Sequence, residues 1–445
     1  MSTSASPDLS TTSAPRSSIL ALGHAVGAIW ALLVGIALLM LGTGLQGSLL
    51  GLRASIEGFS TTTVGIVMSS YYLGYLLGSL RAPRLVSAVG HIRVFAAFAS
   101  IASSTVLLHS LVVEPLGWTL IRIVSGFCMA GLFVVAESWL NEGATNETRG
   151  SLLSIYMVVV YGGMGAGQLL LNVADPGGFE LFIITSVLVS VALVPAALSV
   201  RSAPVIPTPT DVDLREVFHA APLGVIGSVL AGTASGALFG VGVVYAQLAG
   251  LSLAKTSVFM LAAILGGAAL QWPVGMASDR VDRRLVIVVV ALAAAGACLA
   301  GAMGPHGVAL LVVVGALGAL SMPLYPLCNA HANDYIDADR RVGAGSRLVL
   351  ANGLGAIAGP FLASWSMDAV GEAGFFWFLA ALHVLIAAYA AYRITRRSAA
   401  ADPAHYHPYP ARSSVVVSTL DPEAWDEEDH PRFDTEQVPV VSVDD

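Results

Sequence analysis

The feature that most constrains this chain is a series of apolar stretches, each 17 or more residues long, that recur between residues 25 and 392. A helix needs roughly 20 apolar residues to cross the hydrocarbon core of a bilayer. A water-soluble fold has no interior for so many stretches of this length. The composition agrees, because only 11% of the residues are charged, against about 25% in soluble domains. We therefore predict an all-α polytopic membrane protein.

Twelve spans are expected, in two groups of six. The connection 201–221, rich in Pro, Thr and Asp, separates the sixth span from the seventh. A weak repeat supports this division, because the second and eighth spans end at Gly78 and Gly275 and each leads into an arginine-bearing loop. Two six-helix repeats joined by a linker are a transporter architecture. The expected spans are 25–49, 64–80, 94–112, 116–140, 152–171, 182–200, 223–248, 258–276, 285–302, 308–328, 348–365 and 375–392.

The predicted domains follow from this count. They are a disordered N-terminus (1–18), a six-helix bundle (19–200), a linker (201–221), a second six-helix bundle (222–397) and an acidic, disordered tail (398–445). Sixteen arginines fall on the side of the expected termini, against only Arg53 and Lys255 on the other, which predicts that both termini are cytoplasmic.

The net charge narrows the possible partners. Residues 398–445 carry 11 acidic and two basic side chains, a net charge of −9. Since the whole chain has a net charge of −8, the remaining residues carry +1 and the helical body is nearly neutral. Such a body does not suit nucleic acid or anionic lipid headgroups. The three cysteines lie in apolar stretches, and the sequence has no P-loop, nucleophile elbow or zinc motif. We expect no enzyme activity, no cofactor and no metal.

The stretch 275–284 carries the most specific motif. It reads Gly-Met-Ala-Ser-Asp-Arg-Val-Asp-Arg-Arg, a glycine with an Asp-Arg pair four residues later and then a basic pair. This spacing resembles the loop signature of the major facilitator superfamily, and Arg122 with Gly126 resembles the family's Arg-x-x-x-Gly element. The matching first-half loop, 78–93, is longer and lacks the Asp. The resemblance covers residues 19–397.

The resemblance is closest to a bacterial branch with few assigned substrates, on stretches such as Gln271–Pro273 and Tyr325–Pro326. Membership implies a secondary transporter in the bacterial cytoplasmic membrane, working by alternating access as a monomer. It implies a small organic solute bound between the halves and driven by a proton or solute gradient, in either direction. Drug–proton antiporters of the superfamily end a fifth-helix motif in Gly-Pro, and the glycine strip at 162–167 lacks that proline. The missing proline makes a drug–proton antiporter less favoured but does not exclude it.

Arg122 and Glu137 are the two charged residues inside the expected spans, and both lie in the fourth. A charge at the bilayer centre costs about 2.5–3.5 kcal/mol on insertion scales. The two residues are about 22 Å apart along a helix and about 60° apart around it, so one face can present both. We predict that Arg122 binds substrate or takes part in coupling, the alternative being a structural arginine that snorkels outward. For Glu137 we favour a gate partner of Arg149 or Arg84 over a proton site.

Charged residues at the cytoplasmic edge form a second candidate set. Asp279 and the neighbouring arginines can make a breakable ion-pair cluster that latches one conformation. The alternative is that these arginines serve only as positive-inside charges. The gate and motif candidates are Gly78, Arg84, Glu137, Arg149, Gly275, Asp279, Arg280, Arg283, Arg284 and Asp334.

Uncharged polar side chains within the spans can line a solute cavity, although a helix–helix hydrogen bond is the commoner role for any one of them. Pro323 and Pro326 interrupt the tenth span beside Asn329, which favours a cavity or hinge there. The substrate or coupling candidates are Arg122, Tyr71, Tyr75, Gln168, Trp272, Tyr325, Asn329 and Asn352. A rival hypothesis from another class is a membrane receptor or scaffold whose acidic tail recruits a partner. Deletion of residues 398–445 separates the two, because a transporter keeps most of its activity.

Overall fold

The computed structural model describes residues 14–142, 148–199, 212–337, 340–400 and 404–408. Every regular element in these residues is a helix. The first half contains α1 (Ala14–Ile56), α2 (Thr61–Val89), α3 (His91–Leu111), α4 (Pro115–Glu142), α5 (Arg149–Leu169), the 3-10 turn η1 (Leu170–Asn172), α6 (Glu180–Val191) and α7 (Leu193–Ser199). The second half contains α8 (Leu214–Ala220), α9 (Pro222–Leu248), α10 (Leu253–Ser278), α11 (Arg283–Ala302), α12 (Val308–Ser321), α13 (Leu324–Asn333), α14 (Arg341–Val370) and α15 (Gly374–Ile394).

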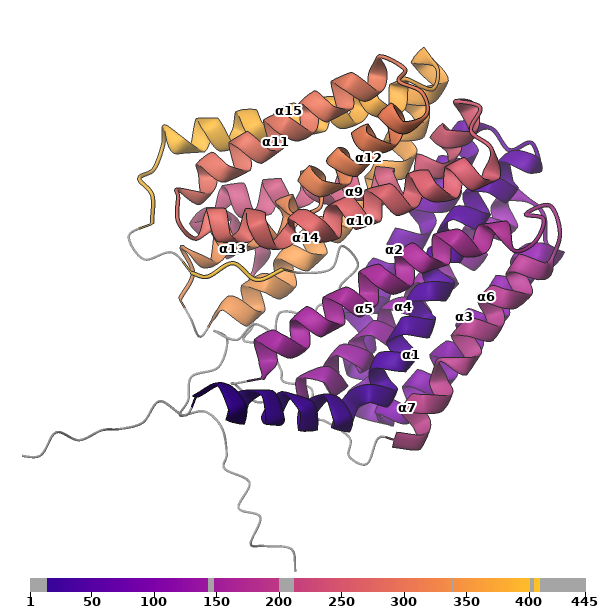
Figure 1. Ribbon diagram of the computed structural model, residues 1–445, viewed down its shortest axis with the longest axis horizontal. Helices are drawn as coiled ribbons and strands as arrows, with labels where there is room; N and C mark the ends of the chain where they lie inside the picture. The colour runs from indigo at the N-terminus through magenta and orange to yellow at the C-terminus, as the bar shows by residue number, and fades with distance from the viewer. Residues whose placement is uncertain (1–13, 143–147, 200–211, 338–339, 401–403, 409–445) are drawn as a thin grey trace, which may run out of the picture.

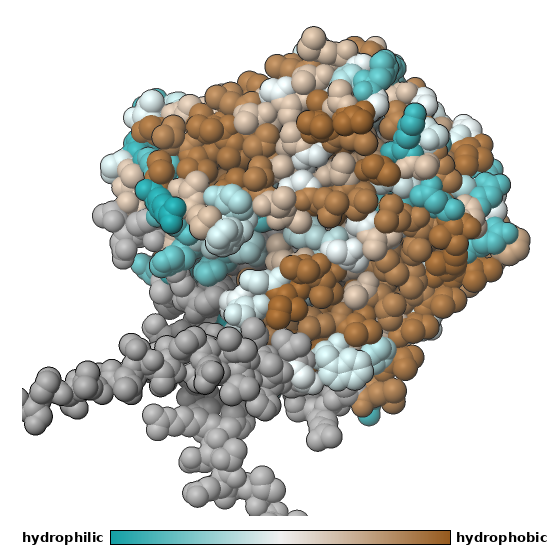
Figure 2. Space-filling view, viewed as in Figure 1, coloured by the Kyte–Doolittle hydropathy of each residue, from teal (hydrophilic) through white to brown (hydrophobic). Residues whose placement is uncertain are grey.

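Eleven helical segments in the described part of the chain are long and apolar enough to cross a membrane. They correspond to eleven of the twelve expected spans, and the all-α membrane fold is confirmed. The sixth expected span, 182–200, falls on α6 and α7, where a shorter apolar helix is found at Glu180–Pro195. The tenth is divided into α12 and α13 at Pro323, whose ring nitrogen has no N–H to donate. Figure 2 shows apolar side chains over much of the visible face of both halves, as a lipid-facing surface requires.

The two halves repeat one packing scheme. In the first half α1 packs on α5, α2 on α4 and α3 on α6. In the second half α9 packs on α14, α10 on α12 and α11 on α15. These are the same three pairings shifted by six spans, and Figure 1 shows the halves as two groups of helices lying against each other. The two pseudo-symmetric bundles expected from the sequence are therefore present.

Glycines set the distance between the paired helices. A Cβ on Gly74 of α2 would lie 2.0 Å from a carbonyl oxygen of α4, and a Cβ on Gly126 of α4 would lie 2.1 Å from one of α2. The corresponding pair in the second half behaves alike, because a Cβ on Gly266 or Gly318 would lie 2.0 Å from the backbone of the partner helix. Small residues allow this close approach of helices in a membrane.

The helices place their connections at two ends. We call the end with the α2–α3, α10–α11 and α13–α14 connections the arginine-rich end, and the end with the α1–α2, α9–α10 and α14–α15 connections the opposite end. The halves meet near the opposite end. There the Thr62 amide donates to Asp368 Oδ2 (3.0 Å), and Asn172 donates to Ser257 (2.9 Å). These two bonds join the halves on the side away from the arginines, and a third, from Gln271 of α10 to Tyr161 of α5 (3.0 Å), joins them nearer the arginine-rich end.

Candidate functional site

Arg122 lies inside the first half and is only 4% exposed. Its guanidinium lies over the ring of Tyr71 on α2, with Cζ 4.3 Å from the ring centre, which is a cation–π contact. The contact depends on the close approach of α2 and α4 at Gly126, one helical turn from Arg122. The Arg-x-x-x-Gly spacing therefore joins the charge to the glycine that brings its aromatic partner within reach.

Tyr75 extends this aromatic surface. Its ring centre lies 6.1 Å from that of Tyr71 and 6.2 Å from that of Phe133 on α4. The structure therefore brings three of the predicted substrate or coupling residues, Arg122, Tyr71 and Tyr75, into one cluster between α2 and α4. An aromatic wall beside a buried cation can hold a planar or anionic solute group.

Glu137, one helical turn from the end of α4, is fully buried and accepts a hydrogen bond from the Tyr156 hydroxyl of α5 (2.9 Å). Of the two arginines predicted as its partners, Arg149 is buried and Arg84 is exposed. The role of Glu137 as a gate partner stays a prediction. The pairing of Tyr156 with Glu137 was not predicted, because a contact between two helices at a separation of 19 residues leaves no periodic signal in a sequence.

Two of the predicted polar candidates make helix–helix hydrogen bonds. Gln168 donates to the Gly44 carbonyl (2.9 Å) and accepts from Ser48 (2.5 Å), which joins α5 to α1. Asn352 donates to the Ser228 carbonyl (3.2 Å), which joins α14 to α9. Both side chains therefore serve the packing within one half.

The remaining three candidates divide between the surface and the interior. Trp272 is 71% exposed, so its side chain points out of the bundle, and the prediction that it lines a cavity does not fit this geometry. Its neighbour Gln271 is buried and donates to the Tyr161 hydroxyl of α5 (3.0 Å). Tyr325 and Asn329 on α13 are buried, and Asn329 Oδ1 has no hydrogen-bond partner among the described residues. Asn329 is thus one of two polar groups of α13 that can still accept from a solute, since Asn333 Oδ1 likewise has no partner among the described residues.

Arg283 is the centre of the charged cluster at the arginine-rich end, and it is 3% exposed. It donates to Asp334 Oδ1 (2.5 Å), to Asp279 Oδ1 (3.0 Å) and to the Ala330 carbonyl (2.9 Å). Burial raises the pKa of Asp334 to about 6, although the nearby Arg283 acts in the opposite direction. The predicted ion-pair cluster is therefore present, with Asp334 as a second carboxylate.

Arg284 makes a separate pair with Asp282. The Asp282 carboxylate caps α11 by accepting from the Arg284 amide (3.0 Å), and its other oxygen accepts from the Arg284 guanidinium (2.7 Å). This hydrogen bonding lowers the pKa of Asp282. Asp282 was not a predicted site residue, although an Asp just before a helix is a recognisable cap. Arg280 is exposed in the same turn, and Gly78 packs on the backbone of α4.

The segment Ala404–Pro408 packs into the same cluster. Tyr406 is 9% exposed, and its main-chain amide donates to Asp279 Oδ1 (2.9 Å). The sequence predicts a disordered tail over residues 398–445. For this segment the structure differs, because its main chain donates to two carboxylates, the buried one of Asp334 and the exposed one of Asp279. The acidic run later in the tail lies outside the described residues.

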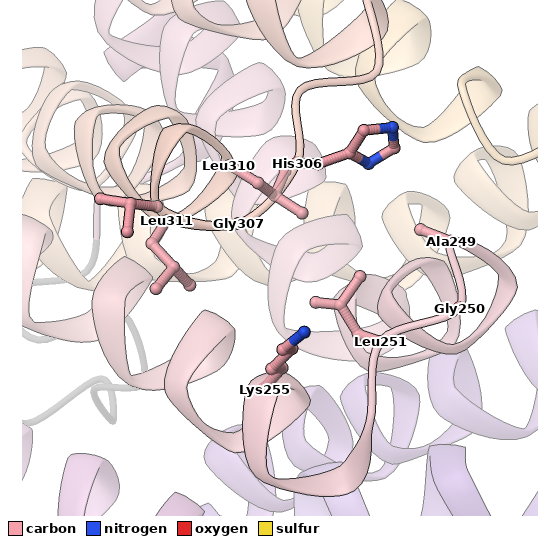
Figure 3. Close-up of a pocket in the computed structure, with 9 residues that line it drawn as sticks. Ala249, Gly250, Leu251, Lys255, His306, Gly307, Leu310 and Leu311 are labelled. Atoms are coloured by element: carbon pink, nitrogen blue, oxygen red, sulfur yellow. The ribbon is translucent and has the colours of Figure 1, made fainter.

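A pocket of about 310 Å³ lies at the opposite end of the second half. Figure 3 shows Lys255 in the first turn of α10 reaching toward the space between the α9–α10 turn and the start of α12. All of its lining residues belong to the second half. This pocket is therefore separate from the Arg122 cluster and does not lie between the halves.

Comparison with known proteins agrees with this architecture. The sequence profile of the Major Facilitator Superfamily matches residues 32–272 and 256–412. An uncharacterised MFS-type transporter of Yersinia pseudotuberculosis is 31% identical over 344 residues, which cover 76% of this chain and 88% of that protein. Another from Yersinia enterocolitica is 29% identical over 350 residues, with the same coverage.

Solved structures show the same fold at low sequence identity. The nucleoside transporter NupG aligns with a TM-score of 0.69 and 13% identity, over 83% of this chain and 99% of NupG. A bacterial homologue of the lysosomal transporter Spinster aligns with a TM-score of 0.62 and 13% identity, over 93% of this chain and all of that structure. Fold and sequence together define a multi-pass membrane transporter of the secondary type. The chain belongs to the major facilitator superfamily.

Proposed function

We propose that this transporter moves a small organic solute with an anionic or zwitterionic group across a bacterial cytoplasmic membrane. The single observation that carries this proposal is the buried Arg122 guanidinium over the Tyr71 ring. A buried charge within a span costs several kcal/mol and is usually kept for function. A guanidinium offers a planar set of donors that fits a carboxylate or phosphate.

The arrangement of the halves supports an inward-facing state, with the arginine-rich end in the cytoplasm. Two of the hydrogen bonds between the halves lie near the opposite end, where Thr62 bonds to Asp368 and Asn172 to Ser257, and the Gln271–Tyr161 bond lies nearer the arginine-rich end. The amide of Phe361 on α14 also donates to the Ser69 hydroxyl of α2 (3.2 Å). Alternating access requires these contacts to open while the arginine-rich end closes. The Spinster homologue with the same fold was solved in an inward-facing conformation.

We propose a proton gradient as the driving force. The sequence alone favours Glu137 as a gate partner, but its full burial and its hydrogen bond to Tyr156 lead us to propose it instead as the group that takes the proton. Its carboxylate is fully buried and bonded to the Tyr156 hydroxyl, so protonation changes the charge of a site shielded from water. The fucose:proton symporter FucP, aligned with a TM-score of 0.54, shows that this fold supports proton-driven transport in another protein. The rival role, a scaffold with a recruiting tail, is not favoured by the family.

The test is a thermal-shift screen of the purified protein against organic acids, amino acids, nucleosides, sugars and cationic drugs. A ligand that binds the native state raises the melting temperature by mass action. We expect an anionic or zwitterionic class to stabilise the wild type and not Arg122→Ala. Arg81→Ala, which removes an exposed arginine of α2, is the matched control and keeps the shift. Equal shifts in Arg122→Ala and the wild type remove Arg122 from the site.

A further inference from the structure

The Tyr406 ring packs directly on Gly275, the glycine of the loop motif at the end of α10. A Cβ on Gly275 would lie 2.2 Å from the Tyr406 ring, so the ring fills the space that a side chain at position 275 would need. The Tyr406 hydroxyl donates to Gln271 Oε1 (2.8 Å), one turn along the same helix. The tyrosine is thus held at its ring and at its hydroxyl.

The main chain of the segment is held by the charged cluster. The Ala404 amide donates to Asp334 Oδ1 (3.0 Å), and the Ala404 carbonyl accepts from Arg283 Nη2 (2.5 Å). The Tyr406 amide donates to Asp279 Oδ1 (2.9 Å). Charge-assisted hydrogen bonds are among the stronger ones in proteins. The charged residues predicted as a latch therefore hold a peptide of the same chain.

Gln271 connects this segment to the first half. Its Oε1 accepts from Tyr406, and its Nε2 donates to the Tyr161 hydroxyl of α5 (3.0 Å). Tyr406 thereby fixes the orientation of an amide that joins α10 to α5. The bound segment lies beside α10 on the side where the first half makes its contact.

We propose that residues 404–406 form an autoinhibitory strap that stabilises the observed arrangement of the halves and must leave before they close at the arginine-rich end. The proposal rests on the proposed alternating access. A segment that binds one conformation shifts the population toward it by its difference in affinity for the two states. The Tyr406 ring covers Gly275 one helical turn beyond the Gln271–Tyr161 contact of α10 with α5, so the two helices cannot approach each other there while the ring is bound.

Spin-label distances between the halves test the strap without any solute. Labels at Ser87→Cys, exposed near the end of α2, and Val281→Cys, 52% exposed in the α10–α11 turn, report the separation at the arginine-rich end. The three native cysteines are buried. We expect the wild type in nanodiscs to show mainly the long distance. In Tyr406→Ala the ratio of short to long distances should rise about tenfold, the effect of losing roughly one buried hydrogen bond or more.

Two further variants sharpen the result. Tyr406→Phe keeps the ring on Gly275 and loses the hydrogen bond to Gln271, so we expect a smaller shift toward the short distance. This variant tests the strap if Tyr406→Ala does not fold. Tyr392→Ala removes a 48% exposed tyrosine of α15 and should leave the distances unchanged. Wild-type distances in folded Tyr406 variants overturn the strap. The distance measurement needs no solute. A negative ligand screen would therefore contradict the proposed function and leave the result for the strap unaffected.

Discussion

Arg122 and Tyr71 face each other across the α2–α4 contact, with the guanidinium carbon 4.3 Å from the ring centre. A desolvated cation–π pair contributes about 2 kcal/mol. We expect Tyr71→Leu to lower the melting temperature and to weaken the binding of any ligand that depends on Arg122. Tyr71→Phe keeps the aromatic face and is the control. If Tyr71→Leu and Tyr71→Phe unfold at the same temperature, the cation–π contact does not stabilise the protein.

Gly126→Ala tests the close helix contact that positions this pair. The added Cβ would lie 2.1 Å from the Tyr71 carbonyl oxygen, so α2 and α4 must move apart. Overpacking of this kind costs about 1–3 kcal/mol. Gly162→Ala on α5 is the matched control, because no atom of the described residues lies within 4 Å of its added Cβ. In thermal unfolding we expect Gly162→Ala to match or exceed the wild type and Gly126→Ala to fall below it. Equal melting temperatures would show that the helices absorb the methyl group.

The fold was predictable because each span needs only length and apolarity, properties that can be counted along the chain. The division into halves followed from the linker, and the pairing of α2 with α4 and α10 with α12 repeats as that division requires. The charged cluster was also within reach, since Asp279 and Arg283 stand four residues apart at the two ends of the short α10–α11 loop.

The inward faces of the spans were less predictable. In α10 apolar residues lie on nearly all sides, so no stripe marks the interior, and the sequence does not distinguish the exposed Trp272 from the buried Gln271. The packing of Tyr406 on α10 was not predicted, for another reason. It depends on hydrogen bonds to Asp279 and Asp334, which are far from it in sequence, and composition carries no information about such pairs.

Glu137 and Tyr156 form a buried pair whose coupling can be measured. Tyr156→Phe removes the hydroxyl that donates to the carboxylate, and loss of a donor to a buried group costs about 1–3 kcal/mol. A double-mutant cycle with Glu137→Gln isolates the pairwise part. We expect a coupling energy of about 1 kcal/mol or more in chemical denaturation. Strictly additive effects would mean that the hydrogen bond contributes nothing to stability, and Tyr389→Phe on α15 controls for loss of a hydroxyl elsewhere.

Asp334 gives the charged cluster a pH dependence with a defined sign. Burial raises its pKa from the ordinary 3.8 to about 6. Between these values the folded protein holds a proton that the unfolded chain has released, so this contribution to stability is full below about pH 4 and is lost as the pH rises through about 6. Arg283, His331 and Arg341 surround the carboxyl, and the two arginines lower its pKa without restoring the ordinary value.

The measurement compares the wild type with Asp334→Asn, in which every other titrating group is kept. Between pH 7.5 and pH 5 the wild type should gain about 1 kcal/mol of stability relative to the variant, from a pKa shift of about two units. Melting temperatures across this range supply the difference. A gap that is constant with pH would mean that Asp334 titrates as an exposed carboxyl, and a gap that changes in the other direction would mean that its pair with Arg283 outweighs its burial.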